Sequence, residues 1–210
     1  MSKGRFITLE GGEGGGKSTQ VFRLAERLRR IGIAVVATRE PGGAEGAEII
    51  RKLLVSGDPG RWDPMTELLL HFAARRDHLR RTVWPALERG EWVLSDRFAD
   101  STMAYQGYGH GLGRETVEAV QALVMDGFRP DLTLILDLPV ADGLKRAEAR
   151  GGENRYERMD LAFHERLRQG YLDIARRDPD RCLVIDGTQP IDSVSEAIAA
   201  AVRSRLSVAV

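Results

Sequence analysis

The sequence predicts an α/β fold in which helices cover both faces of a doubly wound, five-stranded parallel sheet. Short apolar runs of strand length alternate along the chain with longer segments of helical periodicity, a pattern typical of β-α repeats. Several of the runs are apolar almost throughout, as strands buried on both faces are. With 210 residues, the chain is long enough for one domain, residues 1–210, with a full core.

The expected strands are the short apolar runs. In chain order they are Phe6–Glu10, Ala34–Thr38, Trp92–Asp96, Leu132–Asp137 and Cys182–Asp186. The expected helices fill the intervals between them and follow the last one. They lie near Ser18–Ile31, Ala44–Ser56, Pro64–Arg89, Arg114–Asp126, Val140–Arg150, Leu161–Arg177 and Ile191–Arg205. Glycines such as Gly32 and Gly127 stand at helix ends, where a left-handed residue is easily accommodated. Right-handed crossovers would then gather the carboxyl ends of the strands at one edge of the sheet.

The composition excludes several classes of partner. Lys plus Arg total 31 and Asp plus Glu total 31, so no net charge draws the chain to nucleic acid or to an anionic membrane. No signal peptide or membrane-length apolar stretch is present in the sequence. Cys182 is the only cysteine, so no intramolecular disulfide can form, which suits a reducing compartment. We therefore expect a cytoplasmic protein with no nucleic-acid or membrane partner.

The first expected strand leads directly into a glycine-rich loop. Residues Gly11 to Ser18 read Gly-Gly-Glu-Gly-Gly-Gly-Lys-Ser, which completes the phosphate-binding loop pattern. Glycines let successive backbone N–H groups turn inward around a polyphosphate, and the helix that follows adds its positive N-terminal dipole. A merely flexible turn is the alternative, but the strand, the helix and all the fixed positions of the pattern are present. The loop predicts a P-loop NTPase that binds a nucleoside triphosphate.

Polar residues follow three of the other strands. The runs Arg39–Gly43, Asp96–Phe98 and Gly187–Pro190 come directly after the second, third and fifth strands. Because ligands of such sheets sit at the carboxyl ends of the strands, these residues would lie beside the phosphate loop. Two arginines and two carboxylates gathered there favour a second anionic substrate over a switch or a motor.

Together these motifs resemble the thymidylate kinase family, whose members transfer a phosphoryl group from ATP to dTMP. The matching runs are Glu10–Thr19, Thr38–Gly43 and Val93–Gly107, of which the last resembles the family signature at nearly every position. Asp126–Thr133 is also similar to the family, and the resemblance extends over essentially the whole chain. It implies a nucleoside monophosphate kinase domain that uses ATP and Mg²⁺ to convert dTMP to dTDP.

The resemblance also implies roles for individual residues. It assigns ATP contacts to Gly11, Gly12, Glu13, Gly14, Gly15, Gly16, Lys17, Ser18 and Thr19. It assigns dTMP contacts to Glu13, Arg39, Pro41, His71, Phe72, Arg75, Arg97, Ser101, Thr102, Tyr105 and Gln106. Ser18 and Asp96 would organise Mg²⁺, and Lys17, Asp96 and Arg97 would be catalytic. Tyr105 would lie beneath the deoxyribose and crowd out a 2′-hydroxyl, and Thr102 would pair with the polar edge of thymine.

One position departs from the family pattern. The family usually places a phenylalanine four residues before the arginine that we assign to Arg75, and here that position is His71, with Phe72 adjacent. Either His71 stacks on thymine, or the register slips by one residue and Phe72 pairs with Arg76. Both pairs are one helical turn apart, so spacing does not choose between them. We favour Arg75, because His78 then falls where related sequences commonly carry a histidine.

A second departure concerns the transition state. Some members carry a basic residue inside the phosphate loop, but this loop has none. The charge would then come from a mobile lid, residues 146–158 or so, as in the bacterial subtype with lid arginines. Arg150 and Arg155 match those positions, and Arg146 lies on the flanking helix. We expect both matching arginines to be catalytic, and Arg155→Ala to lower kcat far more than it raises KM for dTMP.

Two other functions stay open on sequence alone. One is a different deoxynucleotide or deoxynucleoside kinase on the same scaffold. The other is a GTP-driven switch, which is weakened because the chain has no Asn-Lys-x-Asp guanine motif. Apolar stripes on the expected helices Pro64–Arg89 and Arg114–Asp126 are wide enough to face a partner. The resemblance implies a homodimer.

Overall fold

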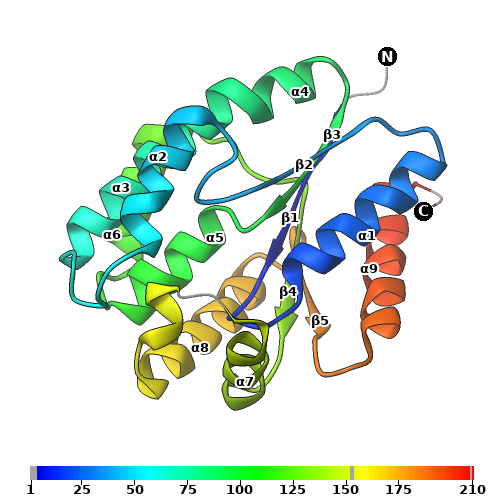
Figure 1. The fold of residues 1–210 in the computed structure, drawn as a ribbon. Coiled ribbons are helices and arrows are strands. Elements are labelled where there is room, and N and C mark those ends of the chain that lie inside the picture. The colour runs from blue at the N-terminus through cyan, green and yellow to red at the C-terminus, as the bar shows by residue number, and fades with distance from the viewer. Residues whose placement is uncertain (1–3, 152–153, 209) are drawn as a thin grey trace.

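A single parallel sheet runs through the computed structural model, which describes residues 4–151, 154–208 and 210. Its strands are β1 (Phe6–Glu10), β2 (Val35–Arg39), β3 (Trp92–Asp96), β4 (Leu132–Asp137) and β5 (Cys182–Asp186). They lie in the order β2-β3-β1-β4-β5, and every pairing is parallel (Figure 1). The predicted doubly wound fold is therefore confirmed. Each strand forms at its predicted residues except β2, which lies one residue later than expected.

Helices connect the strands and cover both faces of the sheet. In chain order they are α1 (Lys17–Arg30), α2 (Glu45–Val55), α3 (Pro64–His78), α4 (Trp84–Glu88), α5 (Ala99–Thr102), α6 (Arg114–Met125), α7 (Val140–Arg150), α8 (Leu161–Arg177) and α9 (Ile191–Leu206). Two wider, π-helical segments are η1 (Leu79–Val83) and η2 (Met103–Gly109), and a 3₁₀ turn, η3, spans Arg155–Arg158. No helix of the described residues is long and apolar enough to cross a membrane.

Apart from the short turn η3, the structure departs from the predicted helices in two places. The expected helix Pro64–Arg89 is divided, because η1 separates α3 from α4 just before Pro85. Proline has no N–H to donate, and its ring crowds the carbonyl four residues earlier, so the helix widens there. The second departure is α5 and η2, which form where no helix was predicted. This segment, Ala99–Gly109, follows β3 directly and contributes residues to the candidate site.

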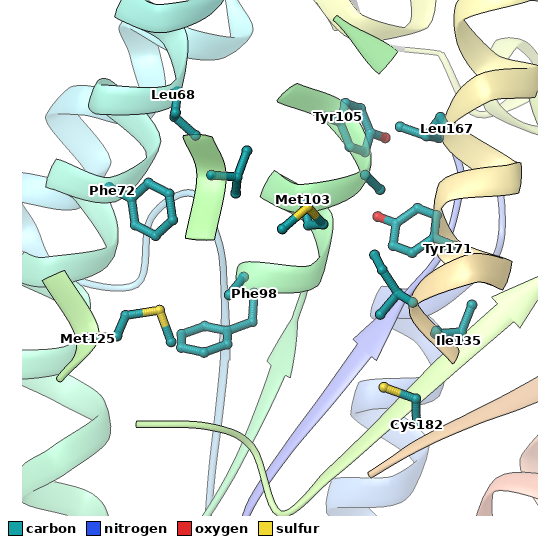
Figure 2. Packing of buried hydrophobic residues seen from close by; sticks show 14 of the residues in the cluster. Leu68, Phe72, Phe98, Met103, Tyr105, Met125, Ile135, Leu167, Tyr171 and Cys182 are labelled. Carbon is teal, nitrogen blue, oxygen red and sulfur yellow. The ribbon is translucent and has the colours of Figure 1, made fainter. Parts of the chain in front are cut away.

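The two faces of the sheet have different cores. On the face covered by α1 and α9, the strands contribute aliphatic side chains such as Ile7, Leu9 and Leu134, and all three are fully buried. The opposite face packs against α3, α5, η2, α6 and α8, and its core includes many aromatic and sulfur-containing side chains. Figure 2 shows part of that core, with Phe72 and Phe98 lying beside Met125.

Polar groups are also buried on this second face. The hydroxyls of Thr8 and Thr133 lie 2.9 Å apart across the β1–β4 pair. Arg181 donates to both carboxylate oxygens of Asp100, at 2.6 and 2.9 Å, and Asp100 is largely buried. Buried polar groups cost free energy unless they are paired, so these contacts keep the face stable while allowing polar residues close to the edge of the sheet.

Candidate active site

The phosphate-binding loop joins β1 to α1 and has the geometry that its sequence predicts. Gly14 has φ +67°, and a Cβ on it would lie 2.0 Å from the carbonyl oxygen of Gly143. Gly16, with φ +79°, precedes α1 directly, and these left-handed positions favour glycine. Lys17 folds back over the loop, and its Nζ donates to the carbonyl oxygen of Gly12 at 2.7 Å. The loop therefore presents backbone amides, a helix N-terminus and an ammonium group together.

A cavity of about 480 Å³ opens beside this loop at the carboxyl ends of the strands. The predicted site residues that line it are Glu13, Gly14, Gly15, Gly16, Lys17, Ser18, Thr19, Arg39, Pro41, His71, Arg75, Asp96, Arg97, Ser101, Thr102, Tyr105, Gln106 and Arg150. Of the other predicted site residues, all of which the structure describes, Gly11, Gly12, Phe72 and Arg155 lie outside this lining. The carbonyl oxygens of Gly11 and Gly12 accept hydrogen bonds from Arg97 and Lys17 instead.

Arg97 lines the cavity and comes directly after β3. It has φ +70°, which is uncommon for a residue with a Cβ and is typical of a position under functional constraint. Its guanidinium donates to Glu13 at 3.1 Å and to the hydroxyls of Ser101 and Tyr171, each at 3.2 Å. The same group lies over the ring of Tyr105, 5.0 Å from its centroid. These contacts hold the guanidinium in one place before any ligand binds.

Behind Arg97, a buried carboxylate fixes the turn that carries it. Glu10, the last residue of β1, accepts hydrogen bonds from the backbone N–H of Phe98 at 2.7 Å and from the hydroxyl of Ser101. Glu10 is fully buried, so its two oxygens are shielded from water and bind only groups of the protein, here those of this turn. Ser101 in turn accepts from Arg97, so Glu10 acts on the arginine through the serine.

A second buried arginine, Arg75, reaches the cavity from α3. It donates through Nε to Glu40 at 2.8 Å and through Nη2 to the hydroxyl of Thr102 at 2.9 Å. His78, also on α3, contacts the other oxygen of Glu40 at 2.8 Å. Arg76, in contrast, is exposed and donates to the carbonyl oxygen of Val124. The register with Arg75 at the cavity, which the sequence favoured, is the one that the structure has.

Of the two candidate stacking residues, His71 faces the cavity and Phe72 does not. The Phe72 ring is buried in the aromatic core (Figure 2). The guanidinium carbon of Arg75 lies 4.8 Å from the centroid of this ring. Residues adjacent on a helix point about 100° apart, so only one of the two can face the cavity. His71 is half-buried and contacts the hydroxyl of Tyr156, in η3, through Nε2 at 2.8 Å. Burial lowers the pKa of His71 to about 4, so this side chain is neutral at physiological pH.

The predicted lid arginines have different environments. Arg150 is exposed at the end of α7, lines the cavity and pairs with Glu157 at 2.5 Å. Arg146 also lines the cavity and donates to the carbonyl oxygen of Gly187 at 3.0 Å. Arg155 is buried and donates to the carbonyl oxygens of Leu54 and Pro59, at 2.9 and 3.0 Å, and to Glu67. Gly152 and Glu153, within the predicted lid, lie outside the described residues.

The placement of Arg155 differs from the expectation that it faces the donor phosphates. Its guanidinium is fully buried against a carboxylate and two carbonyls, which together satisfy a buried cation. The arginine therefore ties η3 to α3 and to the end of α2 in this structure.

Comparisons with known proteins identify the family of the chain. The family model described as thymidylate kinase matches residues 9–198. The chain belongs to the thymidylate kinase family. A thymidylate kinase from Caulobacter vibrioides is 58% identical over 206 residues, which cover 98% of this chain and 99% of that protein. One from Methylococcus capsulatus is 51% identical and covers 99% of each chain. The crystal structure of thymidylate kinase from Ehrlichia chaffeensis is 37% identical, with a TM-score of 0.78, over 95% of this chain and 99% of that one.

Within this thymidylate kinase fold, the charges of the cavity favour an anionic ligand. The basic lining residues are Lys17, Arg39, Arg51, Arg75, Arg97, Arg146 and Arg150, and the acidic ones are Glu13, Glu40, Asp96 and Glu157. Burial opposes ionisation of Glu13, but Arg97 and Lys17 outweigh it and lower the pKa of Glu13 to about 2. Burial likewise opposes ionisation of Glu40, yet Arg75 holds its pKa below the ordinary value. Both carboxylates are therefore charged, and basic residues still outnumber acidic ones.

Sequence reasoning missed several residues of this candidate site. Glu40, Arg51, Tyr156 and Glu157 line the cavity, and Glu10 and Glu67 stand behind it. A signal for Glu10 was present, because an acidic residue that ends a buried strand needs a partner. Tyr156 and Glu67 had no such local signal, since the contacts that bring them to the site join residues far apart in the sequence.

Proposed function

We infer that the protein catalyses transfer of the γ-phosphoryl group of ATP to dTMP, giving ADP and dTDP. The conclusion rests on a triphosphate-binding loop and a basic acceptor cavity side by side in a chain of the thymidylate kinase family. Phosphoryl transfer requires positioning and neutralisation of charge more than covalent chemistry, and this cavity supplies both.

The observation that carries the choice between thymine and cytosine is a pair of polar atoms on two residues that line the cavity. Arg75 Nη1 and Gln106 Oε1 are buried and have no hydrogen-bond partner among the described residues. One is a donor and the other an acceptor. Thymine offers the complementary pair on its edge, since O4 accepts and N3–H donates. Cytosine offers the reverse, so it would leave both buried groups unpaired, which is costly.

The residues of the acceptor half then take the following roles. Arg97 and Arg39 bind the phosphate of dTMP, Arg75 and Gln106 bind the edge of thymine, and His71 and Pro41 flank its faces. Tyr105 and Glu13, joined by a hydrogen bond of 2.6 Å, lie on the side of the deoxyribose and limit the room for a 2′-hydroxyl. Rejecting an added hydroxyl by shape alone contributes only about 1–3 kcal/mol, so exclusion of ribonucleotides should be moderate.

On the donor side, Lys17 and the amides of the loop bind the β- and γ-phosphates. Ser18 and Asp96 fit a Mg²⁺ ion, because the Ser18 hydroxyl contacts the Asp96 carboxylate at the loop and both offer oxygen ligands. No cluster of three or more His, Cys, Asp or Glu side chains that could hold a metal occurs among the described residues. That agrees with Mg²⁺, which usually takes one or two protein ligands beside phosphate and water. When bound, the ion would neutralise charge on the phosphates.

We also propose that residues 146–158 act as a lid on a single kinase domain and that Arg150 supplies the positive charge that the loop lacks. Arg150→Ala should lower kcat about 10²- to 10³-fold, the cost of losing one transition-state donor, and leave the Tm unchanged.

Arg155→Ala should instead lower the free energy of unfolding by about 3–5 kcal/mol, because it leaves Glu67 buried without its cation. Steady-state kinetics and thermal denaturation of both variants distinguish the roles. Arg158→Ala, an exposed change in the same turn, is the control. If Arg155→Ala lost kcat while its Tm stayed unchanged, Arg155 would act on the reacting phosphates and not in stabilising the fold.

The experiment that tests the function measures ADP release with dTMP, dUMP, dCMP, dGMP and thymidine as acceptors. We expect kcat/KM to be highest for dTMP, and a chelator to abolish turnover until Mg²⁺ is restored. A preference for thymidine would identify a deoxynucleoside kinase. Hydrolysis that needs no acceptor would identify a switch.

We further propose a homodimer formed through α2, α3 and α6, which lie side by side (Figure 1). Exposed apolar side chains gather on these helices: Ile49, Leu53, Met65, Leu69 and Leu123. Leu123 is the most exposed of them, at 86%. Sedimentation at micromolar concentration should show a dimer, and a monomer would refute the proposal.

We place the enzyme in the cytoplasm, in agreement with the buried free thiol of Cys182.

A further inference from the structure

The amide of Gln106 faces two different environments. Its Nε2 donates to Glu67 Oε1 at 2.7 Å, and both side chains are fully buried. Its Oε1 is the unpaired buried acceptor described above, on a residue that lines the cavity. A side-chain amide can rotate by about 180°, which exchanges its NH₂ and its oxygen. A neighbouring group must therefore fix the Gln106 amide in this orientation.

Glu67 fixes the orientation because it is a buried anion. Arg155 donates to its other oxygen, and the Nε2 of His110 lies 3.1 Å from the oxygen that Gln106 contacts. Burial opposes ionisation, but the contacts with His110 and Arg155 outweigh it and lower the pKa of Glu67 to about 2. An ionised carboxylate can only accept hydrogen bonds, so only the NH₂ end of Gln106 can face it.

We propose that Glu67 is a specificity-determining residue that acts through Gln106: it holds the amide so that an acceptor, and not a donor, faces the base. The proposal rests on the proposed function, since it takes the cavity beside Arg75 as the base site. Its consequence is discrimination between pyrimidines with an N–H at position 3 and those with an acceptor there. Arg75, which is always a donor, would supply part of this discrimination, and the fixed amide the rest.

The test compares three acceptors in the full-length protein and in Glu67→Gln. A glutamine at this position can donate or accept, so the Gln106 amide is free to present its NH₂ to the base. We expect the kcat/KM ratio of dCMP to dTMP to rise about tenfold, the effect of one correctly placed hydrogen bond. The ratio of dUMP to dTMP should not change, because uracil and thymine share the same hydrogen-bonding edge. An unchanged dCMP ratio, or an equal rise for dUMP, would overturn the proposal.

Two further variants separate this role from folding and from the lid. Arg155→Lys keeps a cation beside Glu67, so the dCMP to dTMP ratio should remain that of the parent even where kcat falls. Gln106→Leu removes both ends of the amide and leaves the Glu67–Arg155 pair in place. It should lower kcat/KM for dTMP more than for dCMP, and it tests the proposal even if Glu67→Gln does not fold. Equal losses for the two nucleotides would count against it. A parent enzyme that does not prefer dTMP to dCMP would refute the proposed function instead.

Discussion

The two faces of the sheet come from the same strands but have different chemistry. Toward α1 and α9, alternate strand residues such as Ile7, Leu9 and Leu134 form an aliphatic core. Toward α3, η2 and α8, alternate residues of the same strands include Thr8 and Glu10, buried among aromatic side chains. The difference indicates separate roles: the first face stabilises the fold, and the second also holds buried polar groups that contact residues of the candidate site.

The largest expected effect comes from the aliphatic face. Leu134→Ala removes a fully buried side chain from the middle of β4 and leaves a cavity that the packed strands cannot close. The free energy of unfolding should fall by about 2–5 kcal/mol, and kcat of the protein that remains folded should equal that of the parent. Denaturant unfolding and steady-state kinetics at low temperature measure the two quantities. Leu161→Ala, at an exposed position, should change stability by less than about 0.5 kcal/mol. A kcat that fell together with stability would show that the aliphatic face also positions the site.

The polar face should behave in the opposite way, and Glu10→Gln tests it. The amide keeps the size of the carboxylate but has one accepting end, so when it accepts from the Phe98 N–H it presents its NH₂ to Ser101 and the serine loses its anionic acceptor. Ser101 is then held less firmly against Arg97, and kcat/KM for dTMP should fall about tenfold, the value of one hydrogen bond to a charged group. Glu165→Gln, an exposed change on α8, is the control.

The stability of Glu10→Gln relative to the parent should depend on pH. Burial raises the pKa of Glu10, and the neighbouring Asp100 adds to the effect. The folded protein therefore holds this proton more tightly than the unfolded chain does, so ionisation of Glu10 weakens folding as the pH rises above the ordinary carboxyl range. The Tm of the variant minus the Tm of the parent should therefore increase as the pH rises from about 5 to about 8. A variant with lower Tm at both pH values and unchanged kcat/KM would show that Glu10 stabilises the fold only.

The sequence was sufficient to predict the fold and the conformation of the phosphate-binding loop, because both depend on local patterns. The strands were predicted to within one residue, and the loop is a contiguous motif whose glycine conformations follow from its residues. The acceptor site could be predicted only in part. Glu67 meets Arg155 and Gln106 through contacts that span 88 and 39 residues, and no local pattern encodes such a pairing. The choice between His71 and Phe72 likewise depended on which side chain the aromatic core accommodates.

The smallest expected effect concerns Lys17, which belongs to a helix of the aliphatic face but lies at the cavity. Burial, together with the nearby charge of Arg97, lowers the pKa of Lys17 to about 8. The protonated form binds phosphate, so kcat/KM for ATP should decline as the pH rises through about 8, by about twofold at that pH. Stability should change in the opposite direction. The folded protein releases this proton before the unfolded chain does, so the free energy of unfolding should rise between about pH 8 and 10.5.

Opposite trends in activity and stability exclude denaturation as the cause of the decline. Lys17→Arg keeps its charge throughout this range, so the decline should disappear from its pH profile whatever its absolute rate. If the profile of Lys17→Arg declined at the same pH as that of the parent, another group would control ATP binding. The buried charge that the aliphatic face brings to the site would then have no measurable part in the pH dependence, and the division between the two faces would be sharper than we propose.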